Sequence, residues 1–253
     1  MEVRLDLTGI LLPKGVKTAV CSCCDELSKG QNPANANSDE RYGSLVAPNV
    51  IATHHQHFVN FRLDFDIDGA NNSVAEMNTR SLPAGPENPC LNAFTMEKTL
   101  LASEVAARRD MSSQSSRKWH VFNPASRNAL GHLAGFTLVP HENSVPYALP
   151  EAAVRQRARL LDHHFWVTRF KPAEMNRAGY YPNQSRGVDG LHEWTQDDES
   201  VVNHDIVVWH TMGVTHNPRP EEWPVMSAAH AGFEIVPSGF FERNPALDVP
   251  NKP

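Results

Sequence analysis

Apolar and polar residues alternate along several short segments of this chain, and the clearest case runs from residue 55 to residue 66. Side chains of a β-strand alternate between its two faces, so this segment is predicted to be a strand. One face would carry His55, His57, Val59, Phe61, Leu63 and Phe65, and the other Gln56, Phe58, Asn60, Arg62, Asp64 and Asp66. The two histidines therefore continue an apolar stripe, and we expect them to point towards a core.

Similar patterns predict further elements. The predicted strands are Val3–Leu12, His55–Ile67, Trp119–Phe122, Gly135–Val139, Phe165–Phe170, Asp205–Thr211 and Gly232–Ile235. Asp68-Gly69 predicts a tight turn, after which Asn71–Val74 would begin a return strand. By composition, Met96–Asp110 and Ala152–Leu161 favour helices. The first of these also alternates, so a strand in a sandwich is its alternative.

The 19 Pro and 14 Gly are spread through the chain and separate short apolar segments. This punctuation predicts a mainly β, antiparallel architecture with long loops, among them Gly30–Glu40 and Asn176–Gly190. A chain of 253 residues with 40% hydrophobic residues is long enough to bury one large core. Since it contains no repeat and no clear linker, we expect one domain over residues 1–253.

The net charge, the apolar runs and the two ends of the chain bear on its partners and its location. The formal net charge is −6 and no basic stripe is present, which argues against a nucleic-acid partner. No run of 18 apolar residues occurs, so no membrane span is predicted. The start of the chain alternates like a strand and unlike a signal peptide, and its end, Asn251-Lys252-Pro253, is not a peroxisomal tripeptide. We therefore expect an intracellular location, cytoplasmic or peroxisomal.

The four cysteines do not form a metal motif. Cys21, Cys23 and Cys24 lack the spacing of paired zinc ligands, and Cys90 stands alone. We expect free thiols, and nothing in this pattern requires an oxidising compartment.

The pair His55 and His57 is a candidate metal site, because a rigid strand would present two imidazoles from one face. Imidazole suits Cu, Zn, Fe and Ni. His54 is a weaker candidate because it lies on the opposite face. The chain has 13 His, so a chance pair is the alternative, and spacing alone does not identify a third ligand.

The segment from Asp205 to Met226, DIVVWHTMGVTHNPRPEEWPVM, closely resembles the C-terminal catalytic domain of copper-containing (topaquinone) amine oxidases. The same holds for HQHF at 55–58, RLD at 62–64, FWVTR at 165–169, PSGFF at 237–241 and NPALDVP at 244–250. The resemblance runs from about residue 2 to residue 250 in the same order. It implies a large antiparallel β-sandwich, the copper amine oxidase supersandwich, incomplete at its N-terminal side.

The resemblance also implies a site. Copper would be bound by His55, His57 and His216, and Met226 would line the nearby oxygen-side pocket. A core methionine is the alternative for Met226. His210 is expected to be structural or to support the ligands.

A second cation, calcium or manganese, is implied as well. Its oxygen ligands would be the side chains of Asp64, Asp66 and Asp205 and the backbone carbonyls of Phe65 and Ile206. The alternative is that these acids are solvated strand residues.

Enzymes of this family oxidise primary amines with O2 and water to aldehydes, ammonia and hydrogen peroxide. They use topaquinone, formed from a tyrosine in an Asn-Tyr-Asp/Glu motif, and a catalytic-base Asp, both upstream of the histidine pair. In this chain no tyrosine among Tyr42, Tyr147, Tyr180 and Tyr181 follows an Asn, and no counterpart of the base is present. We therefore expect a truncated catalytic domain that is inactive alone.

Three interpretations compete at this point. The first is a fragment of an amine oxidase, which the resemblance implies would be a homodimer acting on a primary amine and O2. The second is a non-catalytic copper-binding β-sandwich paralogue. The third, an unrelated metalloenzyme such as a cupin-type dioxygenase, is disfavoured because several independent motifs agree.

Overall fold

The structure is a computed structural model that describes residues 1–16, 40–181 and 187–250. The predictions for Cys21, Cys23 and Cys24 and for most of the loop Gly30–Glu40 lie outside these residues. The chain divides into two compact units. The larger unit contains residues 1–3, 59–212 and 232–253, and the smaller unit contains residues 4–58 and 213–231.

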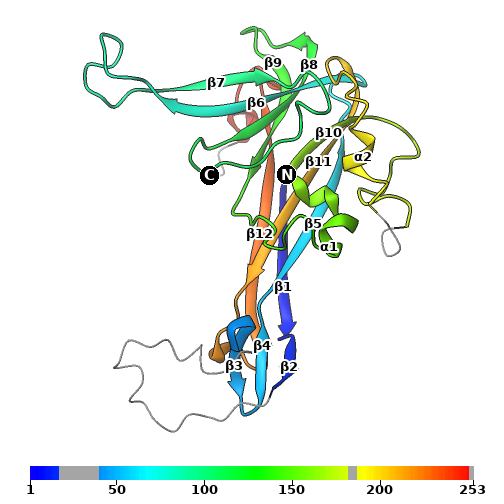
Figure 1. The fold of residues 1–253 in the computed structure, drawn as a ribbon. Helices are drawn as coiled ribbons and strands as arrows, with labels where there is room; N and C mark the ends of the chain where they lie inside the picture. The colour runs from blue at the N-terminus through cyan, green and yellow to red at the C-terminus, as the bar shows by residue number, and fades with distance from the viewer. Residues whose placement is uncertain (17–39, 182–186, 251–253) are drawn as a thin grey trace. The chain divides into compact units, whose positions relative to one another are not determined.

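The larger unit is built on an antiparallel sheet with the strand order β12-β9-β8-β6-β11-β10, in which β7 pairs with β6 and β5 pairs with β11 (Figure 1). The strands are β5 (His55–Asp64), β6 (Asn71–Ser81), β7 (Phe94–Leu100), β8 (Lys118–Arg127), β9 (Leu133–Pro140), β10 (Phe165–Arg169), β11 (His204–His216) and β12 (Val225–Ser238). Helices are short: α1 (Ala153–Arg157), α2 (Leu191–Trp194), η4 (Arg159–Asp162) and η7 (Pro245–Asp248).

The smaller unit contains a three-stranded sheet with the order β2-β4-β3. Its elements are β2 (Pro13–Gly15), η3 (Glu40–Tyr42), β3 (Gly43–Ala47), β4 (Val50–Thr53) and η6 (Pro220–Glu222). Most of β1 (Glu2–Ile10) and one end each of β5, β11 and β12 belong to this unit. The alternating exposure of β1 is what its sequence pattern predicts.

The mainly antiparallel β fold is confirmed, and every predicted strand is present, most of them longer than predicted. The turn at Asp68-Gly69 is also confirmed, because both residues have positive φ, 50° and 122°. The Asn72 side chain closes this turn by accepting from the Ile67 amide at 3.1 Å and donating to the Gly69 carbonyl at 2.9 Å. The return strand then begins at Asn71 as expected.

The predicted helix at Met96–Asp110 is wrong. Its first part is β7, which pairs along its whole length with β6, from Phe94 opposite Ser81 to Leu100 opposite Ala75. Helix propensity is a weak preference, and the backbone hydrogen bonds offered by β6 override it here. The helix predicted at Ala152–Leu161 is present but broken into α1 and η4 at Ala158, whose φ and ψ are −123° and 47°.

Aromatic side chains fill the core of the larger unit. Trp119 of β8 stacks on Phe165 of β10 with ring centroids 4.2 Å apart and planes 4° from parallel. A second cluster joins η4, β10, α2 and β11 through Leu160, Trp166, Leu191, Val207 and Trp209. The Trp166 indole donates to the carbonyls of Leu160 and His163 at 3.1 and 3.0 Å, which satisfies its buried N–H.

Candidate metal centre

Three histidines converge within the smaller unit. His55 and His57 lie at the start of β5, and His216 is the last residue of β11. The His55 ring centroid is 4.9 Å from that of His57 and 5.1 Å from that of His216. The rings meet edge to face, so none of them stacks over the nitrogens of another.

The two-residue period of the strands explains this convergence. The Gln56 amide donates to the Thr215 hydroxyl at 2.8 Å, which fastens the start of β5 to the end of β11. Residues next to Gln56 and Thr215 in sequence must then face the other way. These are the three histidines, since His55 and His57 flank Gln56 and His216 follows Thr215.

We had expected His55 and His57 to point into a core. Instead, all three histidines line a cavity. His57 is exposed, His55 is partly exposed, and only His216 is buried. The cavity has a volume of about 320 Å³. Its wall is otherwise mainly apolar and consists of Leu7, Thr8, Ile10, Leu11, Leu12, Val214, Met226 and Ala229 together with the three histidines. Met226 lines the same cavity as the three histidines, and its role beside a copper ion stays a prediction.

The tautomer of His55 is fixed by the backbone. Its Nδ1 lies 2.8 Å from the carbonyl oxygen of Thr53. A carbonyl can only accept, so Nδ1 carries the proton and Nε2 holds the lone pair of the neutral ring. Partial desolvation, and then the charges of His55 and His216, lower the pKa of His57, which favours the neutral imidazole at pH 7.

His216 is oriented by an acid that the sequence pattern did not single out. Its Nε2 lies 3.1 Å from Oε2 of Glu222 in η6. Since a carboxylate accepts, Nε2 is the donor, and Nδ1 is left with the lone pair. Within the described residues, this buried Nδ1 has no hydrogen-bond partner. A buried polar atom without a partner is costly, and here it is the atom free to bind a metal.

Glu222 is itself held firmly in place. Its Oε2 accepts from the Arg219 backbone amide at 2.9 Å, and its Oε1 lies 3.3 Å from both the Arg219 guanidinium and the Ser227 hydroxyl. The Arg219 amide, followed by the side chains of His216 and Arg219, lowers the pKa of Glu222 to about 2. The acid is therefore charged at neutral pH. The Ser44 hydroxyl also donates to the Pro218 carbonyl, which fixes the turn between His216 and η6.

The donor set fits a transition metal. Three imidazoles, two of them with a lone-pair nitrogen identified by the contact at the other nitrogen, adjoin one mainly apolar cavity. Such a set suits copper and leaves space for a further ligand. His54, which carries no such contact, has its backbone amide bonded to the Tyr42 carbonyl at 2.9 Å.

Comparison with known proteins identifies the fold and the family. The family described as "Copper amine oxidase, enzyme domain" matches residues 1–253. The chain belongs to the copper amine oxidase family. Copper and topaquinone are the cofactors that membership in this family implies.

Relatives share this membership. The chain is 44% identical over 213 residues to histamine oxidase from Arthrobacter globiformis, covering 84% of this chain and 31% of the relative. It is 43% identical over 215 residues to the peroxisomal copper-containing diamine oxidase 1 of Nicotiana tabacum, covering 83% and 27%. The structure matches the copper-containing benzylamine oxidase of Hansenula polymorpha with a TM-score of 0.82 and 29% identity, over 98% of this chain and 37% of that one. The chain thus spans about a third of the length of these relatives.

The acids predicted to bind a second cation belong to the larger unit. Burial and then the negative charges of Asp64 and Asp66 raise the pKa of Asp205, while Arg62 lowers it. Asp64 and Asp66 therefore act on Asp205 electrostatically, but among the described residues the three acids do not form a group whose oxygens all lie within 4.8 Å of one another. Arg62 lies 3.0 Å from Asp64 and partly neutralises it. Ile206, whose carbonyl was also predicted as a ligand, is fully buried.

His210 is structural, as one of its two predicted roles requires. It is fully buried in the larger unit, where its ring centroid lies 5.1 Å from that of Phe233 and 6.1 Å from that of Trp119. Burial, followed by the charge of His164, lowers the pKa of His210 to about 3. The ring is therefore neutral in the folded chain.

The four tyrosines named above are each more than 60% exposed, from Tyr42 at 61% to Tyr181 at 71%. Cys90 is an exposed free thiol, as predicted. In the described part of the chain, no helix has the length and apolar character needed to cross a membrane.

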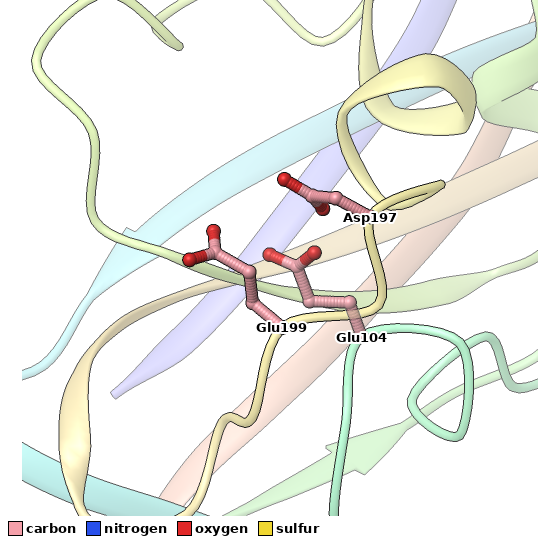
Figure 2. A group of neighbouring side chains, drawn as sticks. All are labelled: Glu104, Asp197 and Glu199. Atoms are coloured by element: carbon pink, nitrogen blue, oxygen red, sulfur yellow. The ribbon is translucent and has the colours of Figure 1, made fainter.

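Sequence reasoning missed an acidic cluster in the larger unit, in which Glu104 is buried, Glu199 half-buried and Asp197 exposed. Figure 2 shows the carboxylates of Glu104, Asp197 and Glu199 pointing towards one another, and one oxygen of each lies within 4.8 Å of the others. Two backbone contacts bring them together: Glu104 N donates to the Glu199 carbonyl at 3.0 Å and Val201 N to the Ala102 carbonyl at 3.2 Å. The signal was the acidic stretch at 197–199, but Glu104 lay in a segment predicted to be helical.

Basic side chains balance this cluster. Lys171 Nζ lies 2.7 Å from Glu199 and 3.5 Å from Asp197, and the Arg169 amide donates to Glu104 at 3.1 Å. Glu104 is nevertheless fully buried, and one of its oxygens has no partner among the described residues. Burial, with Asp197 adding to it, raises the pKa of Glu104 to about 7. Its carboxyl is thus neutral in mildly acidic solution and charged above neutrality.

This raised pKa predicts a loss of stability with rising pH. The pKa of Glu104 rises from 4.5 to about 7 on folding, so its contribution is complete below pH 4.5 and lost as the pH passes through 7. Glu104→Gln should keep the acceptor and remove the titration. Between about pH 5 and pH 8, the unfolding free energy of the wild type should fall by on the order of 2 kcal/mol more than that of the variant.

Urea denaturation at the two pH values measures this difference. The matched control is Glu97→Gln, because Glu97 is exposed and pairs only with Arg80 at 2.7 Å. The control should keep the wild-type pH dependence. Equal pH dependence in wild type and Glu104→Gln would show that Glu104 does not titrate in this range.

Proposed function

We propose that His55, His57 and His216 bind one copper ion, and that the chain supplies the copper side of a primary-amine oxidase active site. The observation that carries this proposal is that His55 and His216 each have one ring nitrogen engaged by a hydrogen-bond acceptor. Thr53 and Glu222 occupy one nitrogen of His55 and of His216, and each leaves the other nitrogen for a metal. Together with the quinone side of such a site, the reaction would convert a primary amine, O2 and water to an aldehyde, ammonia and hydrogen peroxide.

Bound copper would supply a redox-active Lewis-acid centre. The chain's own residues do three things around it. Thr53 and Glu222 hold the protons of His55 and His216 on the nitrogens that face away from the metal. The low pKa of His57 keeps its ring available as a ligand at neutral pH. The apolar wall that includes Leu11, Val214 and Met226 limits water around the centre.

By itself, the 253-residue chain is proposed to bind copper without oxidising amines. Oxidation in this family requires topaquinone and a base, and no tyrosine of the chain follows an Asn. A non-catalytic copper-binding β-sandwich is the second candidate, favoured by the same lack of an Asn-Tyr motif. The homodimer implied by the resemblance stays a prediction.

Copper titration tests the proposed site. The chain should bind one Cu(II), measured by competition with a chelator and by electron paramagnetic resonance. His216→Ala should weaken binding by at least about 100-fold, because loss of an outer-shell partner alone costs roughly 10–100-fold. His54→Ala is the matched control, since His54 neighbours the pair but does not line the cavity, and it should bind like the wild type.

Activity is measured on the same samples. Amine-dependent peroxide release and a quinone stain should both be negative for the chain alone. A positive stain would contradict the argument from the missing tyrosine motif. Failure of the wild type to bind copper would contradict the proposed site itself.

Glu222 gives a separate prediction about the copper ligands. Glu222→Gln replaces a charged acceptor of His216 by a neutral amide and should weaken Cu(II) binding by about 10-fold or more. Glu221→Gln removes the same charge one residue earlier, where the side chain is exposed, and should leave affinity and the paramagnetic spectrum unchanged. An equal effect of both substitutions would show that only overall charge matters.

We also propose that Asp64, Asp66 and Asp205, with the carbonyls of Phe65 and Ile206, bind Ca²⁺ or Mn²⁺. The support is that burial and then the negative charges of Asp64 and Asp66 raise the pKa of Asp205, and a divalent cation would offset these charges. Hard oxygen donors of this kind suit both ions.

Calcium should therefore raise the thermal unfolding temperature of the chain, because a ligand that binds only the folded state stabilises it. Asp205→Asn should abolish this rise. Asp68→Asn is the control: Asp68 lies nearby in sequence at a φ of 50°, which Asn tolerates, and the rise should persist. A rise of the same size in Asp205→Asn would place the calcium elsewhere.

A further inference from the structure

The larger unit contains a second cavity that the proposed function does not use. It has a volume of about 620 Å³, within the usual range of small-molecule sites. We call it the His120 cavity. Strands β6, β7 and β8, the turn between β8 and β9, and the end of β12 contribute its lining, which includes Lys98, His120, Arg127 and His132.

The charge of this lining is one-sided. Lys98 and Arg127 carry positive charge, His120 and His132 add two imidazoles, and no Asp or Glu lines the cavity. Among the described residues neither Lys98 nor Arg127 takes part in an ion pair; Arg127 donates only to the Gly131 carbonyl, at 2.9 Å. The chain as a whole has a net charge of −6, so the basic lining of this cavity is opposite in sign to the chain's overall charge.

His120 provides a buried polar atom at this cavity. Its side chain is on β8, only 4% of the residue is exposed, and Nε2 has no hydrogen-bond partner among the described residues. The backbone of Gly135 on the neighbouring strand β9 packs against this nitrogen, because a Cβ at position 135 would lie 2.5 Å from it. Nε2 is therefore enclosed by protein, and other atoms of the ring form part of the cavity wall.

The positive charge reaches this imidazole. Burial, followed by the charge of Lys98, lowers the pKa of His120 to about 4. Lys98 therefore acts electrostatically on the interior of the cavity, although it stands on the exposed strand β7. A bound anion would offset the positive charge of Lys98.

We propose that the His120 cavity binds a small anionic ligand through a phosphate or carboxylate group. Lys98 and Arg127 supply the charge and the hydrogen-bond donors, and the His120 ring forms part of the wall beside them. Charge-assisted hydrogen bonds from lysine and arginine are the usual means by which proteins hold such oxyanions. The volume of about 620 Å³ exceeds that of a bare oxyanion, so the ligand carries an organic part as well.

Calorimetric titration of the 253-residue chain with inorganic phosphate, at an ionic strength held constant with sodium chloride, tests the proposal. Phosphate should bind saturably and should shift the ring signals of His120 in the nuclear magnetic resonance spectrum. Lys98→Met and Arg127→Met should each weaken binding by about tenfold or more, the value of one lost charged hydrogen bond.

Arg80→Met is the matched control. Arg80 lies on the same β6–β7 hairpin as Lys98 but pairs with Glu97 and does not line the cavity, so this variant should bind phosphate like the wild type. Acetate in place of phosphate distinguishes the two ligand groups, and the tighter of the two identifies the class. Absence of saturable binding of either anion, or an equal loss in Arg80→Met and Lys98→Met, would overturn the proposal.

Discussion

The candidate metal centre depends on the two-residue period of side chains along a β-strand. Once Gln56 and Thr215 are joined by a hydrogen bond on one face, the neighbouring histidines must occupy the other face. This constraint is purely geometric and does not depend on any metal. It brings together His55 and His57 with a residue about 160 positions further along the chain, and both strands are held by backbone pairing.

Convergence alone would not make a metal site, because an imidazole can present either nitrogen. The backbone carbonyl of Thr53 and the carboxylate of Glu222 each engage one nitrogen and so select the other. Glu222 depends in turn on the Arg219 amide and on the short helix η6. The segment HNPRPEE at 216–222 begins with the last residue of β11. In it, the turn at Arg219 orients Glu222, and Glu222 orients the proposed ligand His216.

In the larger unit, neighbouring groups likewise decide whether a buried acid is charged. Glu76 is 1% exposed, yet two oxygens accept from Arg109 at 2.7 Å each, and these bonds lower the pKa of Glu76 against the effect of burial. Glu104 has weaker compensation, since only the Arg169 amide donates to it, and its pKa is raised. Where a buried acid meets a guanidinium it stays charged, and where it meets another acid it takes up a proton.

The sequence by itself determined the strands, the turn at Asp68-Gly69, the common face of His55 and His57, and the family. All of these follow from local periodicity, from turn chemistry or from a motif read along the chain. Only the tertiary structure decided that residues 94–100 form a strand, because β6 supplies the hydrogen bonds that outweigh helix propensity. Only it showed Glu222 at His216, the acid cluster at Glu104 and the basic cavity at His120. Each of these rests on contacts between residues whose spacing in sequence carries no period, and such contacts exist only after the chain has folded.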